Sequence, residues 1–124
     1  MFVFAERGVV MEYLYSINPV LTGKTIIIYG IGERERSIFA ALLQQEVYVT
    51  AFSLQEGQES MMKKILNKRV ITFKELTEDY SDAYVIIAGE RARVDVEVLR
   101  NAGIENVIVE NITLKDKRMV FLGE

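Results

Sequence analysis

A short apolar run that ends in two glycines constrains the fold of this chain more than any other feature. Residues 25–29 read TIIIY, and Gly30 and Gly32 follow at once. A continuous, β-branched run of this length is typical of a strand that is buried on both faces of a parallel sheet. Residues 37–45, SIFAALLQQ, then carry apolar side chains at helical spacing. A buried strand, a glycine turn and a helix in this order predict a βα unit.

The same alternation of strands and helices continues along the chain. Further β-rich runs are VYVTAF (47–52), VI (70–71), AYVIIA (83–88) and VIV (107–109). Helices are expected at 73–80, where Thr72 and Glu75 form a capping box, and at 91–102, which ends before Gly103. The pattern predicts an α/β fold with a doubly wound, Rossmann-like parallel sheet of about five strands. The expected strand order is third, second, first, fourth, fifth.

Three segments fall outside this alternation. Residues 60–68, SMMKKILNK, predict one or two helical turns, and the tail RMVFLGE predicts an edge strand or a packing surface. Residues 9–17, VVMEYLYSI, predict an apolar helix that is buried on more than one side, and we expect a homo-oligomer contact there. We expect one domain, divided into a helical extension (1–22), a core (23–110) and a tail (111–124).

The composition narrows the chemistry that is available to the chain. Its 124 residues include no cysteine and no histidine, which excludes disulfides, Cys- or His-based metal sites and histidine general bases. No nucleophile–base pair can be recognised, so we predict no catalytic residue and favour a binding role over an enzyme. The net charge of −3 argues against a nucleic-acid partner. No apolar run has the length of a membrane helix and no signal peptide is recognisable, so we expect a soluble, cytoplasmic protein.

The glycine turn after the first strand is placed like a dinucleotide-binding loop. Gly30 would permit the tight turn, and Gly32 would let the backbone approach a pyrophosphate at the helix N-terminus. The third glycine of that fingerprint is replaced by Glu35, which adds bulk and negative charge near the phosphates. No acidic residue ends the second strand to hold a ribose, and Ser53 would do so more weakly than a carboxylate. The cofactor is therefore unknown among nucleotides, nucleotide-sugars and NAD(P), and ordinary NAD binding is disfavoured.

The pentapeptides GERER (32–36) and GERAR (89–93) repeat at two expected strand-to-helix turns. In a doubly wound sheet the first and fourth strands are neighbours, so these turns flank the point where ligands bind. Because arginine binds phosphate bidentately, we expect a small phosphorylated ligand. The four arginines of the two turns, Arg34, Arg36, Arg91 and Arg93, could converge on one crevice. The ligand contacts would include Gly89, Arg34, Arg36 and Arg91. The alternative is that both turns are solvated helix starts, whose arginines pair with neighbouring glutamates.

One known group of domains shares this order of motifs. The chain resembles the Rossmann-like NAD(P)- or nucleotide-sugar-binding domains of bacterial polysaccharide-biosynthesis proteins, such as the N-terminal domain of sugar acyltransferases. The resemblance covers residues 23–110 and rests on TIIIYGIG, VYVTAF, RVITFKEL, DAYVIIA and LRNAGIENVIV. In those acyltransferases the domain binds the sugar nucleotide, with the first loop beside the phosphates, which implicates Gly30 and Gly32. The resemblance implies a non-catalytic nucleotide- or nucleotide-sugar-binding module. The alternative is a degenerate domain of the same fold that serves oligomerisation or structure and binds no ligand.

Overall fold

The computed structural model describes residue 21 and residues 23–112 and 117–122. The expected helix at 9–17, and the homo-oligomer contact expected on it, lie outside the described residues. Within the described part of the chain, no helix is both long and apolar enough to cross a membrane.

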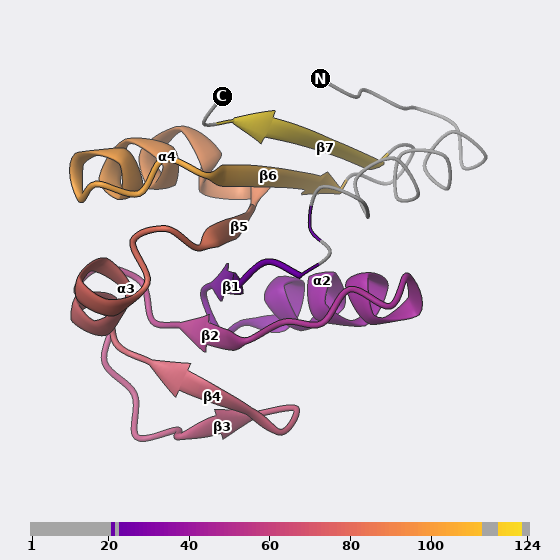
Figure 1. The fold of residues 1–124 in the computed structure, drawn as a ribbon, viewed down its shortest axis with the longest axis horizontal. Coiled ribbons are helices and arrows are strands. Elements are labelled where there is room, and N and C mark those ends of the chain that lie inside the picture. The colour runs from indigo at the N-terminus through magenta and orange to yellow at the C-terminus, as the bar shows by residue number, and fades with distance from the viewer. Residues whose placement is uncertain (1–20, 22, 113–116, 123–124) are drawn as a thin grey trace.

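The described residues form one mixed sheet in the order β3-β4-β2-β1-β5-β6-β7. Figure 1 shows this order from the bottom of the molecule to the top. The five strands from β4 to β6 run parallel, and β3 and β7 add antiparallel edges. The expected order of the parallel strands is confirmed, as is an edge strand in the tail. The strands are β1 (Ile26–Tyr29), β2 (Ala51–Ser53), β3 (Lys64–Ile65), β4 (Lys68–Ile71), β5 (Tyr84–Ala88), β6 (Val107–Ile112) and β7 (Lys117–Leu122).

Helices cover both faces of the sheet, which accounts for the apolar runs of the central strands. Side chains alternate along a strand, so Ile28 of β1 joins one core cluster and Ile27 joins the other. The first cluster includes Ile38 of α2, and the second includes Leu76 of α3 and Leu99 of α4. In Figure 1, α2 lies at the right and α3 and α4 at the left of the strands. The helical elements are α2 (Glu33–Gln44), α3 (Phe73–Asp79), the 3-10 turn η1 (Gly89–Arg91) and α4 (Ala92–Asn101).

The helical turns expected at 60–68 are wrong, because this segment forms the β3–β4 hairpin instead. Its two turn residues, Leu66 and Asn67, have φ angles of 49° and 64°. A two-residue turn with positive φ at both positions matches the twist of antiparallel strands, and asparagine tolerates that conformation well. The backbone N–H of Val70 closes the hairpin by donating to the carbonyl of Lys63 at 2.9 Å. The strand expected at 70–71 therefore begins at Lys68.

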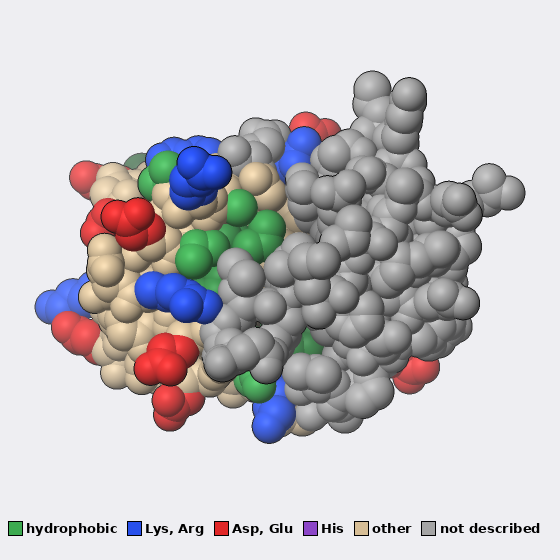
Figure 2. Space-filling model, turned by 90° about the horizontal axis from the view of Figure 1, so that it is seen from above, with side chains coloured by type: hydrophobic (Ala, Val, Ile, Leu, Met, Phe, Trp, Pro, Cys, Tyr) green, Lys and Arg blue, Asp and Glu red, His purple; other side chains and the backbone are tan. Residues whose placement is uncertain are grey.

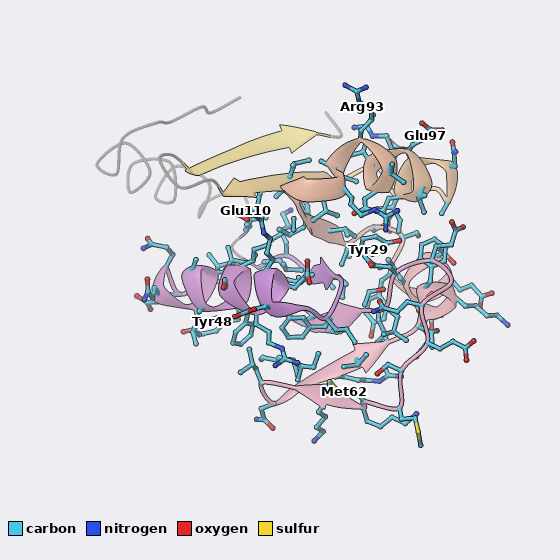
Figure 3. All side chains as sticks on the ribbon, turned by 180° about the vertical axis from the view of Figure 1, so that it is seen from behind. Tyr29, Tyr48, Met62, Arg93, Glu97 and Glu110 are labelled. Carbon is cyan, nitrogen blue, oxygen red and sulfur yellow. The ribbon has the colours of Figure 1, made fainter. Side chains whose placement is uncertain are left out.

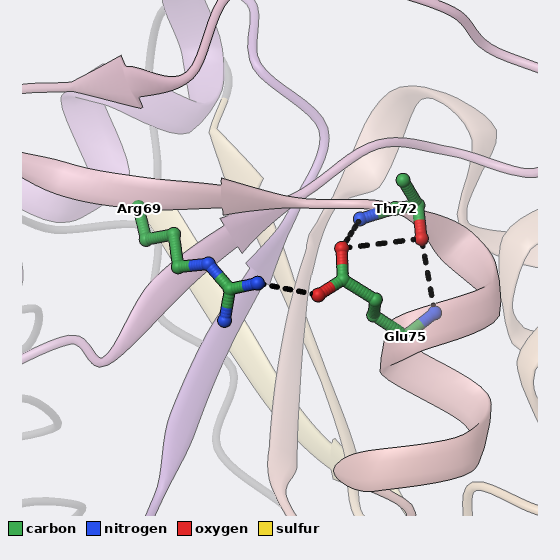
Figure 4. Close-up of polar contacts among 3 residues, drawn as sticks. All are labelled: Arg69, Thr72 and Glu75. Carbon is green, nitrogen blue, oxygen red and sulfur yellow. Dashed lines mark hydrogen bonds and ion pairs between the residues drawn. The ribbon is translucent and has the colours of Figure 1, made fainter.

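The capping box expected at the start of α3 is confirmed. The N–H of Glu75 donates to Thr72 Oγ1 at 3.0 Å, and the N–H of Thr72 donates to Glu75 Oε1 at 3.1 Å (Figure 4). The hydrogen bond from the Thr72 N–H, with further help from the Arg69 guanidinium, lowers the pKa of the Glu75 carboxyl. The side chains of Thr72 and Glu75 therefore each accept a hydrogen bond from the other residue's backbone N–H, which fixes the start of α3 directly after β4.

Candidate functional site

An open cleft of about 580 Å³ lies at the carboxyl ends of β1 and β5. It opens between the first turn of α2 and the first turn of α4, on the two neighbouring strands where the chain reverses its direction across the sheet. In α/β proteins this position is where ligands bind. The residues that line the cleft are Glu33, Arg34, Glu35, Ser37, Gln55, Ala88, Arg91 and Asp95.

The glycine turn joins β1 to α2 at the edge of this cleft. Gly30 has a φ of +113°, which is open to glycine and strained for other residues. Its N–H donates to the carbonyl of Ser53 at 2.7 Å, so the turn is anchored to the end of β2. Gly32 is the N-cap residue of α2 and has extended backbone angles. The turn thus has the tight geometry expected for a loop that exposes its backbone to a ligand.

The Glu35 side chain folds back over the glycine turn. The N–H of Gly32 donates to Glu35 Oε1 at 2.7 Å, which satisfies one of the free donors at the start of α2. A Cβ atom built on Gly30 would lie 2.9 Å from Glu35 Cδ, and one built on Gly32 would lie 2.9 Å from Oε1. The carboxylate therefore occupies the space above both glycines, where a phosphate would approach. Glu35 is an internal cap of the turn, a role that its place in the fingerprint did not indicate.

The two GERxR turns bring one arginine each to the cleft. Arg34 of α2 and Arg91 of η1 line it, and they come from turns that are far apart in the sequence. Arg36 and Arg93 are exposed and do not line the cleft. Figure 3 shows Arg93 pointing away from the body of the protein. Of the four arginines that were expected to converge, the fold brings two together.

Two other expected contact residues have structural roles. Gly89 begins η1, and its carbonyl accepts the N–H of Ala92. Ser53 is fully buried, and its hydroxyl donates to the carbonyl of Leu54 at 2.8 Å. Since the Ser53 hydroxyl is buried and already bonded, its expected role as a ribose ligand does not agree with the structure, and we leave Ser53 out of the proposed site.

Asp95 is a cleft residue that the sequence did not single out. It is only 7% exposed, although its side chain lines the cleft. Burial raises the pKa of the Asp95 carboxyl, the Arg91 guanidinium opposes this shift, and the Glu35 carboxylate adds to it. From the sequence alone, an acid in the first turn of a helix is expected to be exposed and to interact with the helix dipole. The burial of Asp95 is seen only once α4 is packed against the sheet.

Tyr29 fixes the loop that borders the cleft. The N–H of Glu56 donates to the Tyr29 hydroxyl at 2.9 Å, and the ring packs against Phe73 with centroids 6.2 Å apart. Burial raises the pKa of the Tyr29 phenol, and the hydrogen bond from Glu56 opposes the shift. Figure 3 places Tyr29 within the protein, between the sheet and the helices. Tyr29 therefore holds the loop that carries Gln55 rather than facing a ligand.

Replacing Glu35 with alanine is expected to lower the free energy of unfolding by about 1 kcal/mol, because the Gly32 N–H loses its acceptor. The matched control is Glu33→Ala, which removes an acid from the same helical turn without removing a cap, and should cost only about 0.3 kcal/mol. Urea unfolding of the three proteins measures both values. Equal losses in the two variants would show that the Glu35 cap contributes nothing beyond its charge.

Replacing Asp95 with asparagine is expected to stabilise the protein at pH 7 by about 1 kcal/mol, because the partly desolvated carboxylate makes no hydrogen bond within the described residues. Because the pKa of Asp95 is raised in the folded protein, the folded state binds this proton more tightly than the unfolded state does. The stabilisation that results is complete below pH 3.8, the ordinary pKa, and is lost as the pH rises through the pKa of the folded state. The advantage of the variant should therefore shrink as the pH falls to about 3.5. Urea unfolding at several pH values measures this, with exposed Glu97→Gln as the control. A variant less stable than the parent at pH 7 would contradict the prediction.

The cleft combines charges of both signs. Three carboxylates and two guanidinium groups line it, and among the described residues no group of three or more acids is placed to hold a metal ion. On the coloured part of the face in Figure 2, Lys and Arg side chains and Asp and Glu side chains lie around a group of hydrophobic side chains. Such a cleft suits a ligand that carries an anionic group beside hydrogen-bond donors.

Comparison with known proteins places most of the chain in a described family. A family model described as "C2185-like, N-terminal" matches residues 22–111, which contain the cleft and both GERxR turns. No curated protein and no solved structure matches the chain.

Proposed function

The chain belongs to the C2185-like N-terminal family, and from that premise we propose that it is a Rossmann-like, non-catalytic module that binds a nucleotide or a nucleotide-sugar in the cleft between β1 and β5. The phosphates would lie at the start of α2, and Arg34 and Arg91 would hold them from two sides.

The observation that carries this proposal is the convergence of Arg34 and Arg91 on one cleft beside a glycine turn. A guanidinium group offers a planar pair of N–H donors to phosphate oxygens, and a helix N-terminus adds free backbone donors and a positive dipole end. These features reach the same point only because β1 and β5 are neighbours in the sheet. Solvated helix starts alone would not require the two arginines to face a common space.

Binding would require the Glu35 carboxylate to leave the glycine turn. The Gly32 N–H would then exchange one anionic acceptor for another, a phosphate oxygen for a carboxylate oxygen. Such an exchange keeps the helix start capped in both states, so its net cost is small compared with opening an uncapped turn. In the unliganded protein, the Glu35 carboxylate thus occupies the position on the Gly32 N–H that the phosphate would take in the complex.

The resemblance to domains of polysaccharide-biosynthesis proteins supports a nucleotide-sugar, and with it a cytoplasmic role in polysaccharide biosynthesis. NAD(P) fits less well, because no acid stands at the end of β2 and Ser53 is buried. UDP-sugars are therefore the first ligands to test, with NAD and NADP as comparisons.

A thermal-shift panel of UDP-sugars, UTP, ATP, CoA, NAD and NADP tests the proposal. A ligand present at one hundred times its Kd adds about 2.7 kcal/mol of stability. For a domain of this size that corresponds to a rise in Tm of about 5–10 °C. Calorimetric titration then measures the affinity. The absence of both a shift and a heat with every compound at millimolar concentration would contradict the proposal.

The second candidate is a structural or oligomerisation domain that has kept the fold and lost its ligand. The Glu35 cap favours it, because the turn already satisfies its own donor without a bound phosphate. Light scattering across micromolar concentrations distinguishes the candidates. A concentration-dependent oligomer without nucleotide binding would favour this second role, and a monomer that binds nucleotide would exclude it.

A further inference from the structure

The buried carboxylate of Asp95 has no structural role in the described part of the chain that would account for it. Within the described residues it makes no hydrogen bond, and it faces the cleft with only 7% of its surface exposed. The N-cap position of α4 is occupied by Arg91, so Asp95 does not cap the helix. Its oxygens reach the solvent of the cleft, so a bound ligand could supply the hydrogen bonds that the described part of the protein does not.

The surroundings of Asp95 define what it could accept. Arg91 lies close enough to attract its charge, and Glu35 lies close enough to repel it. A ligand phosphate that draws the Arg91 guanidinium to itself would leave the Asp95 carboxylate facing the part of the ligand next to that phosphate. In a nucleotide this part is a ribose, whose hydroxyl groups are hydrogen-bond donors.

We propose that Asp95 is the sugar-recognising acid of this cleft, accepting hydrogen bonds from ribose hydroxyls while Arg34 and Arg91 hold the phosphates. This inference rests on the proposed function. No acid stands at the end of β2, and in this proposal Asp95, which follows β5 in the chain, takes that role. Glu33 and Glu35 fit the role less well, since Glu33 is exposed and Glu35 already caps the glycine turn.

Calorimetric titrations with ATP and UTP, each against its 2′,3′-dideoxy counterpart, test the inference. The unaltered protein should bind the ribonucleotide about tenfold or more tightly, because a hydrogen bond to a charged acceptor is lost with the dideoxy compound. In Asp95→Ala this preference should fall to about one, with the affinity for the dideoxy compound unchanged. Asp95→Asn, which keeps the shape of the side chain, should lose most of the preference. The control is Glu97→Gln, an exposed acid of the same helix that points outward in Figure 3.

The outcomes separate the two proposals. Nucleotide binding without a preference for ribose in the unaltered protein would overturn the role of Asp95 and leave the nucleotide cleft standing. A preference that persists in both Asp95 variants would do the same. The absence of binding by all four nucleotides would overturn the role of Asp95, and would contradict the proposed function if the UDP-sugars also fail to bind.

Discussion

Replacing Phe52 with alanine is expected to lower the free energy of unfolding by about 3–5 kcal/mol. Phe52 lies in β2, is fully buried, and belongs to the core cluster under α2. Its ring lies 5.7 Å from that of Phe39, measured between centroids, so the substitution removes an aromatic pair and leaves a cavity. A loss of this size approaches the whole stability of many small domains, and the variant should be largely unfolded at 37 °C. Urea unfolding followed by circular dichroism measures it.

Tyr48 provides the matched control for Phe52. It is an aromatic residue four positions earlier in the same segment, and 62% of its surface is exposed. Figure 3 shows it at the surface of the protein. Tyr48→Ala should therefore change the stability by no more than about 0.5 kcal/mol. If both substitutions had equal effects, the buried sheet core described above would be wrong.

Replacing both Arg34 and Arg91 with glutamine is expected to weaken nucleotide binding by about 100-fold or more. Each charged hydrogen-bonding group contributes about 1.5–3 kcal/mol, and the two arginines reach the phosphates from separate turns. The fold should be retained, because Arg91 is exposed and Arg34 is only partly buried. Calorimetry with ATP, UTP and a UDP-sugar measures the change, and the circular dichroism spectrum checks the fold.

The control for this pair is the double variant Arg36→Gln with Arg93→Gln. It removes the same two positive charges from the same two turns, but from side chains that do not line the cleft. Its affinity should fall less than about threefold, since only long-range attraction is lost. Equal losses in the two double variants would show that binding depends on net charge rather than on the geometry of the cleft.

The parts of the fold that could be predicted from the sequence depend on local signals. The central strands are continuous β-branched runs, and the start of α3 carries both halves of its capping box, Thr72 and Glu75. The order of the parallel strands then follows from the doubly wound arrangement that the alternation of strands and helices predicts. The β3–β4 hairpin was missed because its signal is a two-residue turn, Leu66 and Asn67, inside a segment whose methionines and lysines favour a helix.

The candidate site was less predictable, because it depends on how side chains are packed. The repeated pentapeptides indicated the correct two turns, but they did not show which arginines face the cleft. The burial of Asp95 follows from the packing of α4 on the sheet, and the position of Glu35 follows from the space left by two glycines. The burial of Asp95 depends on contacts between elements that are distant in sequence, and the position of Glu35 depends on the shape of a turn. Neither property can be predicted from the spacing of residues in the sequence.

The most direct test of the ligand cleft is an NMR titration of the ¹⁵N-labelled protein with a UDP-sugar. We expect the amide signal of Gly32 to shift the most, together with those of Gly30 and Arg91, because phosphate would replace the Glu35 carboxylate on the Gly32 N–H. The amides of Ser81 and Asp82, which line a smaller hollow of about 170 Å³ beside the amino end of β5, should stay unchanged. Shifts at Ser81 and Asp82 with none at Gly32 would show that the ligand does not bind in the cleft between β1 and β5.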